Sequence, residues 1–296
     1  MNIGKSYITI NQTNDCLVST KDNKFVIYNT HPFKINFKRI MSNDIHIIKM
    51  FYRTNILIIV EKRKLNELIL WDDNERKVVG KILLNKNIIN FETNRELIVI
   101  TTDDSLHIYT FNNISLKKKI NTIKNDNGII ILYGDIIVYP NKEVGHLTVM
   151  KYNSNYNMTF KCHNSNIRII TINNDGSLIA TCSEHGTIIR IFNIEDGKLL
   201  KEFRRGITYS IITDLKFNMD SSLLLCNSCH NTVHIYCIKN NNKSYLPEYS
   251  MAKIYNDLSV YCVFLPNNDL LSISDSKFII YSAISNYENI LDENYN

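Results

Sequence analysis

Short apolar or alternating segments recur along the whole chain, and clusters of Asn, Asp, Gly and Ser separate them. Segments of about four to eight residues with a period of two are typical of β-strands. The 3.6-residue period of an amphipathic helix is nearly absent. The pattern therefore predicts an all-β protein built from many short strands.

The predicted strands group into seven consecutive units of about 35–45 residues, each with three or four strands. The fifth and sixth units repeat one order of strands and turns, as INNDGSLIATCSEHGTIIRIF and FNMDSSLLLCNSCHNTVHIYC show. A pair of β-sandwiches would not explain this repeat. Seven repeats predict a seven-bladed WD-type β-propeller, formed as a single domain over residues 1–296. The units cover residues 6–40, 45–84, 88–123, 128–152, 160–203, 211–239 and about 260–284.

Composition narrows the setting in which the protein works. Seven cysteines at irregular spacing argue against a disulfide framework and favour a reducing compartment. No apolar run is long enough to span a membrane, and the N-terminal segment lacks the apolar core of a signal peptide. The net charge of +5 is scattered along the chain, so we expect no nucleic-acid partner. We expect a cytosolic protein whose membrane contact is peripheral.

A Cys-x₂-Cys pair with nearby histidines, in the segment Cys226–Cys237, raises the possibility of a zinc site. His234 and Cys237 are three residues apart on a predicted strand and therefore face opposite sides of the sheet. No second Cys-x₂-Cys pair exists in the chain. We therefore interpret these cysteines as structural and expect no metal site.

The sequence offers little for catalysis. Cys162 and His163 are adjacent, but neighbouring residues on an extended segment point apart, and no orienting Asn or Asp is identifiable. A glycine-rich phosphate loop is also absent. We expect no catalytic residues and no cofactor. A propeller enzyme stays open as an alternative hypothesis.

The segment Phe203-Arg204-Arg205-Gly206 follows the last predicted strand of the fifth unit. Side chains on a strand alternate between faces, so Arg204 and Arg205 should point in opposite directions. Arginine suits phosphate because its planar guanidinium can donate two parallel hydrogen bonds. Two anion sites on either side of one strand are one interpretation, and a solvated basic turn is the other.

The fifth and sixth units resemble the PROPPIN family of WD-type propellers, which bind phosphoinositides and act in autophagy. The resemblance is carried by residues 162–206, which end in FRRG, and by LKFNMDSSLLLCNSCHNTVHIY. It extends more weakly over nearly the whole chain. It implies two lipid head-group sites that flank the FRRG strand. The first would use Arg204, Arg190, Ser183, Thr187 and His163, and the second would use Arg205, Ser228, Thr232 and His234.

Two segments depart from the family pattern. The membrane-inserting loop that the family places in its sixth blade corresponds here to the short stretch 239–253. The family's acidic, lysine and glycine turn is replaced by Cys229-His230-Asn231. The side chains expected to contact the bilayer from the short loop are Tyr245, Leu246, Tyr249 and Met251.

The resemblance implies a monomeric, non-enzymatic effector of phosphatidylinositol 3-phosphate or the 3,5-bisphosphate. Such a protein would be recruited from the cytoplasm to autophagosomal, endosomal or related membranes. Its expected partners are phosphoinositide-containing membranes and a lipid-transfer protein or a conjugation-machinery protein of autophagy. The alternative is a WD-type protein-interaction scaffold that does not bind lipid.

Overall fold

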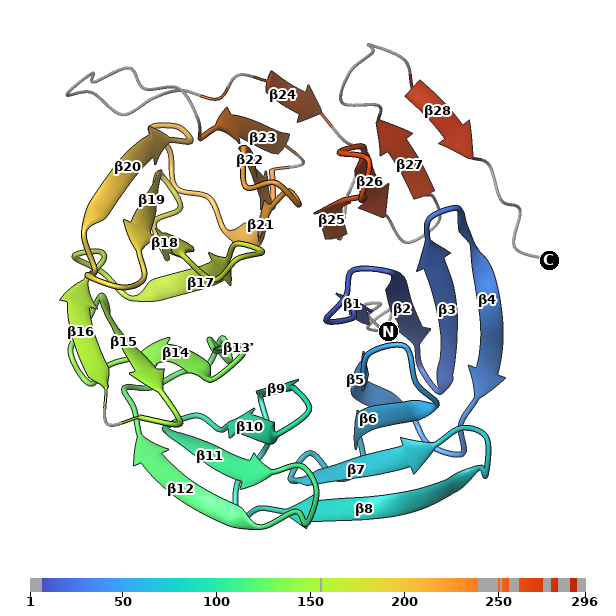
Figure 1. Ribbon diagram of the computed structural model, residues 1–296. Helices are drawn as coiled ribbons and strands as arrows, with labels where there is room; N and C mark the ends of the chain where they lie inside the picture. The colour runs from blue at the N-terminus through green and yellow to red at the C-terminus, as the bar shows by residue number, and fades with distance from the viewer. Residues whose placement is uncertain are drawn as a thin grey trace. The chain divides into compact units, whose positions relative to one another are not determined.

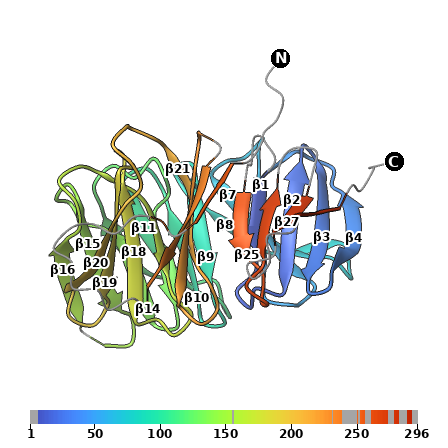
Figure 2. The same cartoon turned by 90° about the horizontal axis from the view of Figure 1, so that it is seen from above.

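The structure is a computed structural model that describes residues 7–154, 156–230, 232–238, 250, 252–255, 261–273, 278–281 and 288–291. These residues form twenty-eight β-strands in seven four-stranded sheets (Figure 1). Neighbouring strands of each sheet are antiparallel and lie side by side (Figure 2). Within these residues there is no helix, so none that could cross a bilayer. The predicted all-β composition is confirmed.

The chain divides into two compact units, Met1–Gly128 and Ile129–Asn296. The first unit contains three of the sheets and the second contains four. The single domain expected over residues 1–296 stays a prediction.

The first unit is built from three sheets whose strands pair in chain order. The first sheet contains β1 (Tyr7–Ile10), β2 (Cys16–Lys21), β3 (Lys24–Thr30) and β4 (Phe33–Ile40). The second contains β5 (Ile45–Met50), β6 (Ile56–Glu61), β7 (Glu67–Asp72) and β8 (Lys77–Leu83). The third contains β9 (Asn90–Thr93), β10 (Leu97–Thr101), β11 (Ser105–Thr110) and β12 (Leu116–Asn121).

The second unit is built in the same way from four sheets. The fourth sheet contains β13 (Ile131–Tyr133), β14 (Ile136–Pro140), β15 (His146–Lys151) and β16 (Asn157–Lys161). The fifth contains β17 (Ile167–Ile172), β18 (Leu178–Ser183), β19 (Ile188–Asn193) and β20 (Leu199–Arg204). The sixth contains β21 (Ile212–Phe217), β22 (Leu223–Ser228), β23 (Thr232–Cys237) and β24 (Ala252–Tyr255). The seventh contains β25 (Tyr261–Phe264), β26 (Leu270–Ile273), β27 (Phe278–Tyr281) and β28 (Glu288–Leu291).

In the third sheet, a middle strand is buried on both faces, whereas the last strand is solvated. Strand β10 is buried at every position, and its sequence LIVIT is a continuous apolar run. Strand β12, with sequence LKKKIN, is exposed at nearly every position. Lysines on an outer strand discourage pairing of its free edge with another chain. The third sheet thus has a buried middle strand and a charged outer edge.

Several predicted unit boundaries are wrong. The sixth unit was predicted to end at about residue 239 and the seventh at about 284, but β24 pairs with β23 and β28 pairs with β27. The fifth unit was predicted to begin at Phe160, but Phe160 lies in β16, which pairs with β15 and so completes the fourth sheet. Strand β16 alternates exposed and half-buried residues and has little apolar sequence. Outermost strands carry weak apolar patterns because only one of their faces packs, which is why this strand was missed.

Two buried asparagines explain the repeat between the fifth and sixth sheets. Asn173 and Asn218 are each 2% exposed and follow the first strand of their sheet. The Oδ1 of Asn173 accepts a hydrogen bond from the Leu178 backbone N–H (2.9 Å), and its Nδ2 donates to the Ser221 hydroxyl of the next sheet (3.0 Å). Asn218 accepts from the Leu223 N–H in the same way (2.9 Å) and donates to Asn268 of the seventh sheet (3.1 Å). The repeated turn sequence therefore links successive sheets.

We expect Asn173→Ala to lower the free energy of unfolding by about 1–3 kcal/mol, because the backbone N–H of the half-buried Leu178 loses its acceptor. The exposed neighbour Asn174 provides a matched control, since Asn174→Ala should change stability by about 0.5 kcal/mol or less. Urea unfolding of both variants measures the difference. Equal stabilities of the two variants would show that the side chain does not link the sheets.

Candidate functional site

Strand β20, which ends at the first arginine of FRRG, places Phe203 and Arg204 on opposite faces of the fifth sheet. In β20, Phe203 pairs with Ile189 of β19, and Arg204 pairs with Ile188. Phe203 is fully buried and stacks on Tyr236 of the sixth sheet, with ring centroids 4.7 Å apart. Because side chains alternate along a strand, Arg204 lies on the face opposite to Phe203.

The guanidinium of Arg205 turns into the loop that follows the strand. Its Nε donates to the carbonyl oxygen of Gly186, and its Nη2 donates to that of Thr208. Burial raises the pKa of Cys226 and of Tyr236, and the Arg205 charge opposes both shifts, which places it near the sixth sheet. Arg205 is therefore a candidate phosphate-binding residue that also stabilises the loop through its own hydrogen bonds.

Arg190 extends from β19 on the same face as Arg204, because it pairs with Glu202 of β20. Its Nε lies 2.7 Å from a carboxylate oxygen of Glu202, and its Nη1 donates to the Cys162 carbonyl (2.6 Å). Both partners of the ion pair are about a quarter exposed, at 28% and 26%. Glu202 thus balances the Arg190 charge, although it is not among the residues predicted for this site.

His163 is buried beside Arg190, at 4% exposure. Its Nε2 lies 2.9 Å from the hydroxyl of Thr181, which pairs with Arg190 across the sheet. Burial, together with the nearby Arg190 charge, lowers the pKa of His163 to about 4. The imidazole is therefore neutral near pH 7 and supplies no positive charge to this face.

Three polar side chains of the first predicted set have no hydrogen-bond partner among the described residues: Arg204, Ser183 and Thr187. Arg204 and Thr187 are half-buried, and Ser183 is 6% exposed. Thr187 lies next to Ile188, the strand partner of Arg204, and its carbonyl accepts from the Arg205 backbone N–H (2.9 Å). One cation and two hydroxyls are thus available to a ligand at this end of the fifth sheet.

The second predicted set is brought together on one face of the sixth sheet, since Ser228 pairs with Thr232 and His234 pairs with Cys226. The hydroxyls of Ser228 and Thr232 lie 2.9 Å apart, and His234 Nδ1 lies 3.1 Å from the Ser250 hydroxyl. All three side chains are less than 10% exposed. These groups are bonded within the protein, so they offer a ligand less than the first set does.

The altered turn after β22 is attached to the FRRG loop. His230 Nδ1 lies 2.8 Å from the hydroxyl of Ser210, and the Cys229 sulfur lies 3.7 Å from the same oxygen. No group of three or more His, Cys, Asp or Glu suited to a metal ion occurs within the described ranges. The predicted bilayer-contacting residues Tyr245, Leu246, Tyr249 and Met251 lie outside the described residues.

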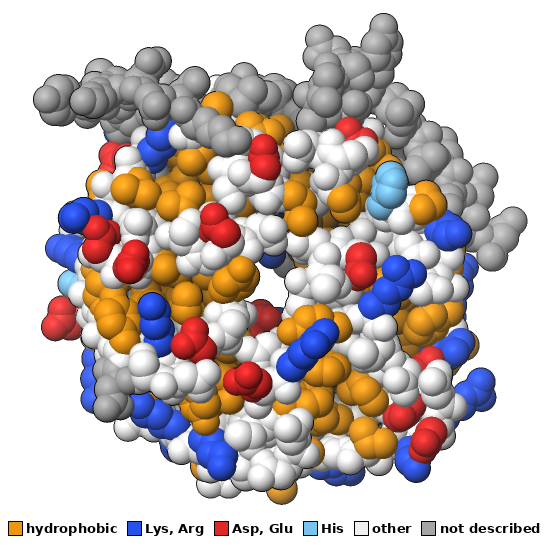
Figure 3. Space-filling view, viewed as in Figure 1, with side chains coloured by type: hydrophobic (Ala, Val, Ile, Leu, Met, Phe, Trp, Pro, Cys, Tyr) orange, Lys and Arg blue, Asp and Glu red, His pale blue; other side chains and the backbone are white. Residues whose placement is uncertain are grey.

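Charges of both signs are interspersed over the described side chains of the face drawn in Figure 3. The net charge of +5 is small for a chain of 296 residues. The described side chains of that face therefore form no broad basic surface.

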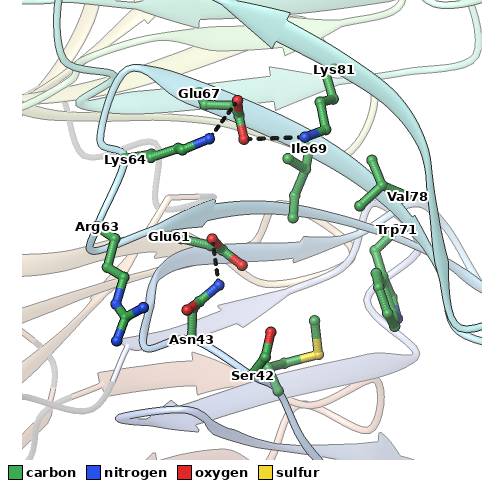
Figure 4. A pocket seen from close by; sticks show the side chains of 11 residues that line it. Ser42, Asn43, Glu61, Arg63, Lys64, Glu67, Ile69, Trp71, Val78 and Lys81 are labelled. Atoms are coloured by element: carbon green, nitrogen blue, oxygen red, sulfur yellow. Dashed lines mark hydrogen bonds and ion pairs between the residues drawn. The ribbon is translucent and has the colours of Figure 1, made fainter.

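A groove of about 390 Å³ lies beside the second sheet, in the first unit (Figure 4). Trp71 and Met41 are among its apolar side chains. The Glu67 carboxylate lies at its rim, between the ammonium groups of Lys64 (3.4 Å) and Lys81 (3.6 Å). The lining residues are Met41, Ser42, Asn43, Glu61, Arg63, Lys64, Glu67, Ile69, Trp71, Val78 and Lys81.

The sequence model of PROPPIN matches residues 9–268 of the chain. SVP1-like protein 2 of Schizosaccharomyces pombe is 32% identical over 244 residues, which cover 78% of this chain and 67% of that protein.

Two solved structures share the fold. Hsv2 of Kluyveromyces marxianus gives a TM-score of 0.84 at 25% identity and covers 94% of this chain and 92% of its own. KlAtg21, solved in complex with the coiled coil of AgAtg16, gives 0.80 at 23% identity and covers 97% and 98%. The predicted seven-bladed β-propeller fold class is confirmed.

Proposed function

Because the chain belongs to the PROPPIN family, a class of phosphoinositide-binding propellers that act in autophagy, we propose that it binds a 3-phosphorylated head group beside its FRRG strand. The ligand is phosphatidylinositol 3-phosphate or the 3,5-bisphosphate. Binding recruits the protein from the cytoplasm to autophagosomal, endosomal or related membranes. The family is a non-enzymatic class, and we assign no catalysis to this chain.

The observation that supports this proposal most directly is the cluster of unpartnered donors at the end of the fifth sheet. Glu202 neutralises Arg190, and His163 is uncharged near pH 7, so Arg204 supplies the uncompensated positive charge. A phosphate monoester carries about −1.5 to −2 charges near pH 7 and has three acceptor oxygens. A guanidinium with two hydroxyls, those of Ser183 and Thr187, matches both its charge and its acceptors.

Calorimetric titration with a soluble short-chain phosphatidylinositol 3-phosphate tests the proposal. We expect two equivalents to bind, one on each face of the FRRG strand, because Arg204 and Arg205 serve different faces. The matched control is the same lipid without the 3-phosphate, for which we expect no heat of binding. No binding of either ligand would leave the WD-type scaffold as the better account.

The proposed protein partners are a lipid-transfer protein or a conjugation-machinery protein of autophagy. KlAtg21, which shares the fold, was solved with the coiled coil of AgAtg16, a precedent for a helical partner. The groove beside the second sheet supports the scaffold alternative as a second function, because apolar side chains lie within a charged rim. At that rim Arg63 is exposed and makes no hydrogen bond or ion pair with the described residues. Arg63→Ala should therefore weaken capture of an acidic helical partner without changing lipid binding.

A further inference from the structure

The loop directly after the FRRG strand exposes apolar side chains. Ile207 is 87% exposed, the largest fraction of any large apolar side chain in the described part of the chain. Tyr209 is 58% exposed and Ile211 is 36% exposed. Between them, Ser210 is fully buried. Thr208 is exposed as well, so the loop directs Ile207, Thr208, Tyr209 and Ile211 outward and only Ser210 inward.

This exposure occurs in a loop that is held in place. Arg205 Nη2 donates to the Thr208 carbonyl, the Ser210 backbone N–H donates to the His185 carbonyl (3.2 Å), and the Ser210 hydroxyl contacts His230. Gly186 has φ +66° and packs so closely that an added Cβ would lie 1.8 Å from the Ser210 carbonyl oxygen. These contacts hold the loop backbone in one conformation, and in that conformation Ile207 and Tyr209 point outward.

The chemistry around these two side chains fits an anionic lipid surface. Arg204 and Arg205 precede Ile207 by three and two residues, so the cationic side chains and the exposed apolar side chains lie close together at one end of the sheet. Apolar side chains beside cations are typical of segments that lie in the membrane interface. Tyrosine is favoured there because its ring enters the apolar layer while its hydroxyl stays hydrated. A protein partner would not require the adjacent uncompensated positive charge of Arg204.

We propose that Ile207 and Tyr209 insert into the interfacial layer of the bilayer whose head groups the FRRG arginines bind. This inference rests on the proposed function and adds a second kind of contact to it. The segment is distinct from the stretch 239–253, which the family resemblance suggests as the membrane loop. Arg205 connects the two roles, because the guanidinium proposed to bind a head group also fixes the carbonyl of Thr208.

The test compares Ile207→Ser/Tyr209→Ser with Leu199→Ser/Leu200→Ser in flotation with phosphatidylcholine vesicles that contain phosphatidylinositol 3-phosphate. Leu199 and Leu200 are 50% and 51% exposed at the opposite end of β20, so the control removes similar apolar surface from the same sheet. We expect the loop variant to bind at least about 10-fold more weakly per side chain removed, and the control variant to bind normally. Equal binding by the two variants would overturn the proposal.

A direct readout of insertion uses tryptophan fluorescence, for which Trp71 is the only native background. Ile207→Trp should be quenched by phosphatidylcholine with brominated acyl chains, whereas Leu200→Trp should not be quenched beyond the parent protein. Absence of quenching at position 207 in vesicle-bound protein would also overturn the proposal.

Titration of the Ile207→Ser/Tyr209→Ser variant with the soluble short-chain lipid separates this inference from the proposed function. We expect head-group binding to be retained, because neither side chain belongs to the head-group sets. If head-group binding is normal but vesicle binding is not weakened, insertion is wrong and the proposed function stands. If the parent protein binds neither the soluble lipid nor the vesicles, both are wrong.

Discussion

Arg204→Ala should weaken binding to vesicles containing phosphatidylinositol 3-phosphate by about 10²–10⁴, because losing one of two sites removes the gain from simultaneous engagement. The same change should leave the free energy of unfolding within about 0.5 kcal/mol of the parent. The guanidinium makes no hydrogen bond with the described residues, so its removal leaves no group in that part of the chain unpaired. Vesicle flotation and urea unfolding measure the two quantities.

Arg63→Ala is the matched control for charge, since it removes one exposed arginine from the first unit. It should bind vesicles as the parent protein does. If both arginine variants weaken binding equally, the effect is a general loss of positive charge, and a specific site at Arg204 is wrong. Titration of Arg204→Ala with the soluble lipid should still give one equivalent.

Arg205→Ala should reduce both vesicle binding and stability. The guanidinium of Arg205 donates to the carbonyls of Gly186 and Thr208, and we expect a loss of about 1–3 kcal/mol in the free energy of unfolding. Arg205→Lys separates the two roles, because it keeps the charge and loses the planar pair of donors. Urea unfolding of both variants, with soluble-lipid titration, makes the comparison.

A stability of Arg205→Ala equal to that of Arg204→Ala would contradict the assigned carbonyl contacts. A loss of stability in Arg205→Ala with unchanged titration would mean that this arginine supports the loop and binds no head group. The bonded hydroxyls of Ser228 and Thr232 make the Arg205 side the one where head-group binding is more costly, since these groups must exchange partners.

The blade repeat could be predicted from the sequence because its determinants are local. The turn after β17 depends on Asn173 and a nearby left-handed residue, Gly176 at φ +76°. The sixth sheet repeats this with Asn218 and Ser221 at φ +58°. Strand β16 was assigned to the wrong sheet because a solvated outer strand carries little apolar pattern.

At the candidate site, alternation along β20 was sufficient to place Arg204 and Phe203 on different faces. The same alternation places Glu202 on the face of Arg204, but its position opposite Arg190 depends on the register between β19 and β20. The Arg205 contacts had no such signal. Their acceptors are backbone carbonyls, which every residue carries, and only the tertiary fold brings the carbonyls of Gly186 and Thr208 to the guanidinium.

The carbonyl contacts of Arg205 also bear on how substitutions accumulate in this motif. Under the proposed function, a descendant of this chain that had lost head-group binding could replace Arg204 at little energetic cost, whereas replacing Arg205 would still destabilise the loop. Selection for folding alone would then retain the second arginine. In related sequences, loss of the first arginine of FRRG would therefore indicate loss of lipid recognition, whereas retention of the second arginine would not indicate that lipid recognition is kept.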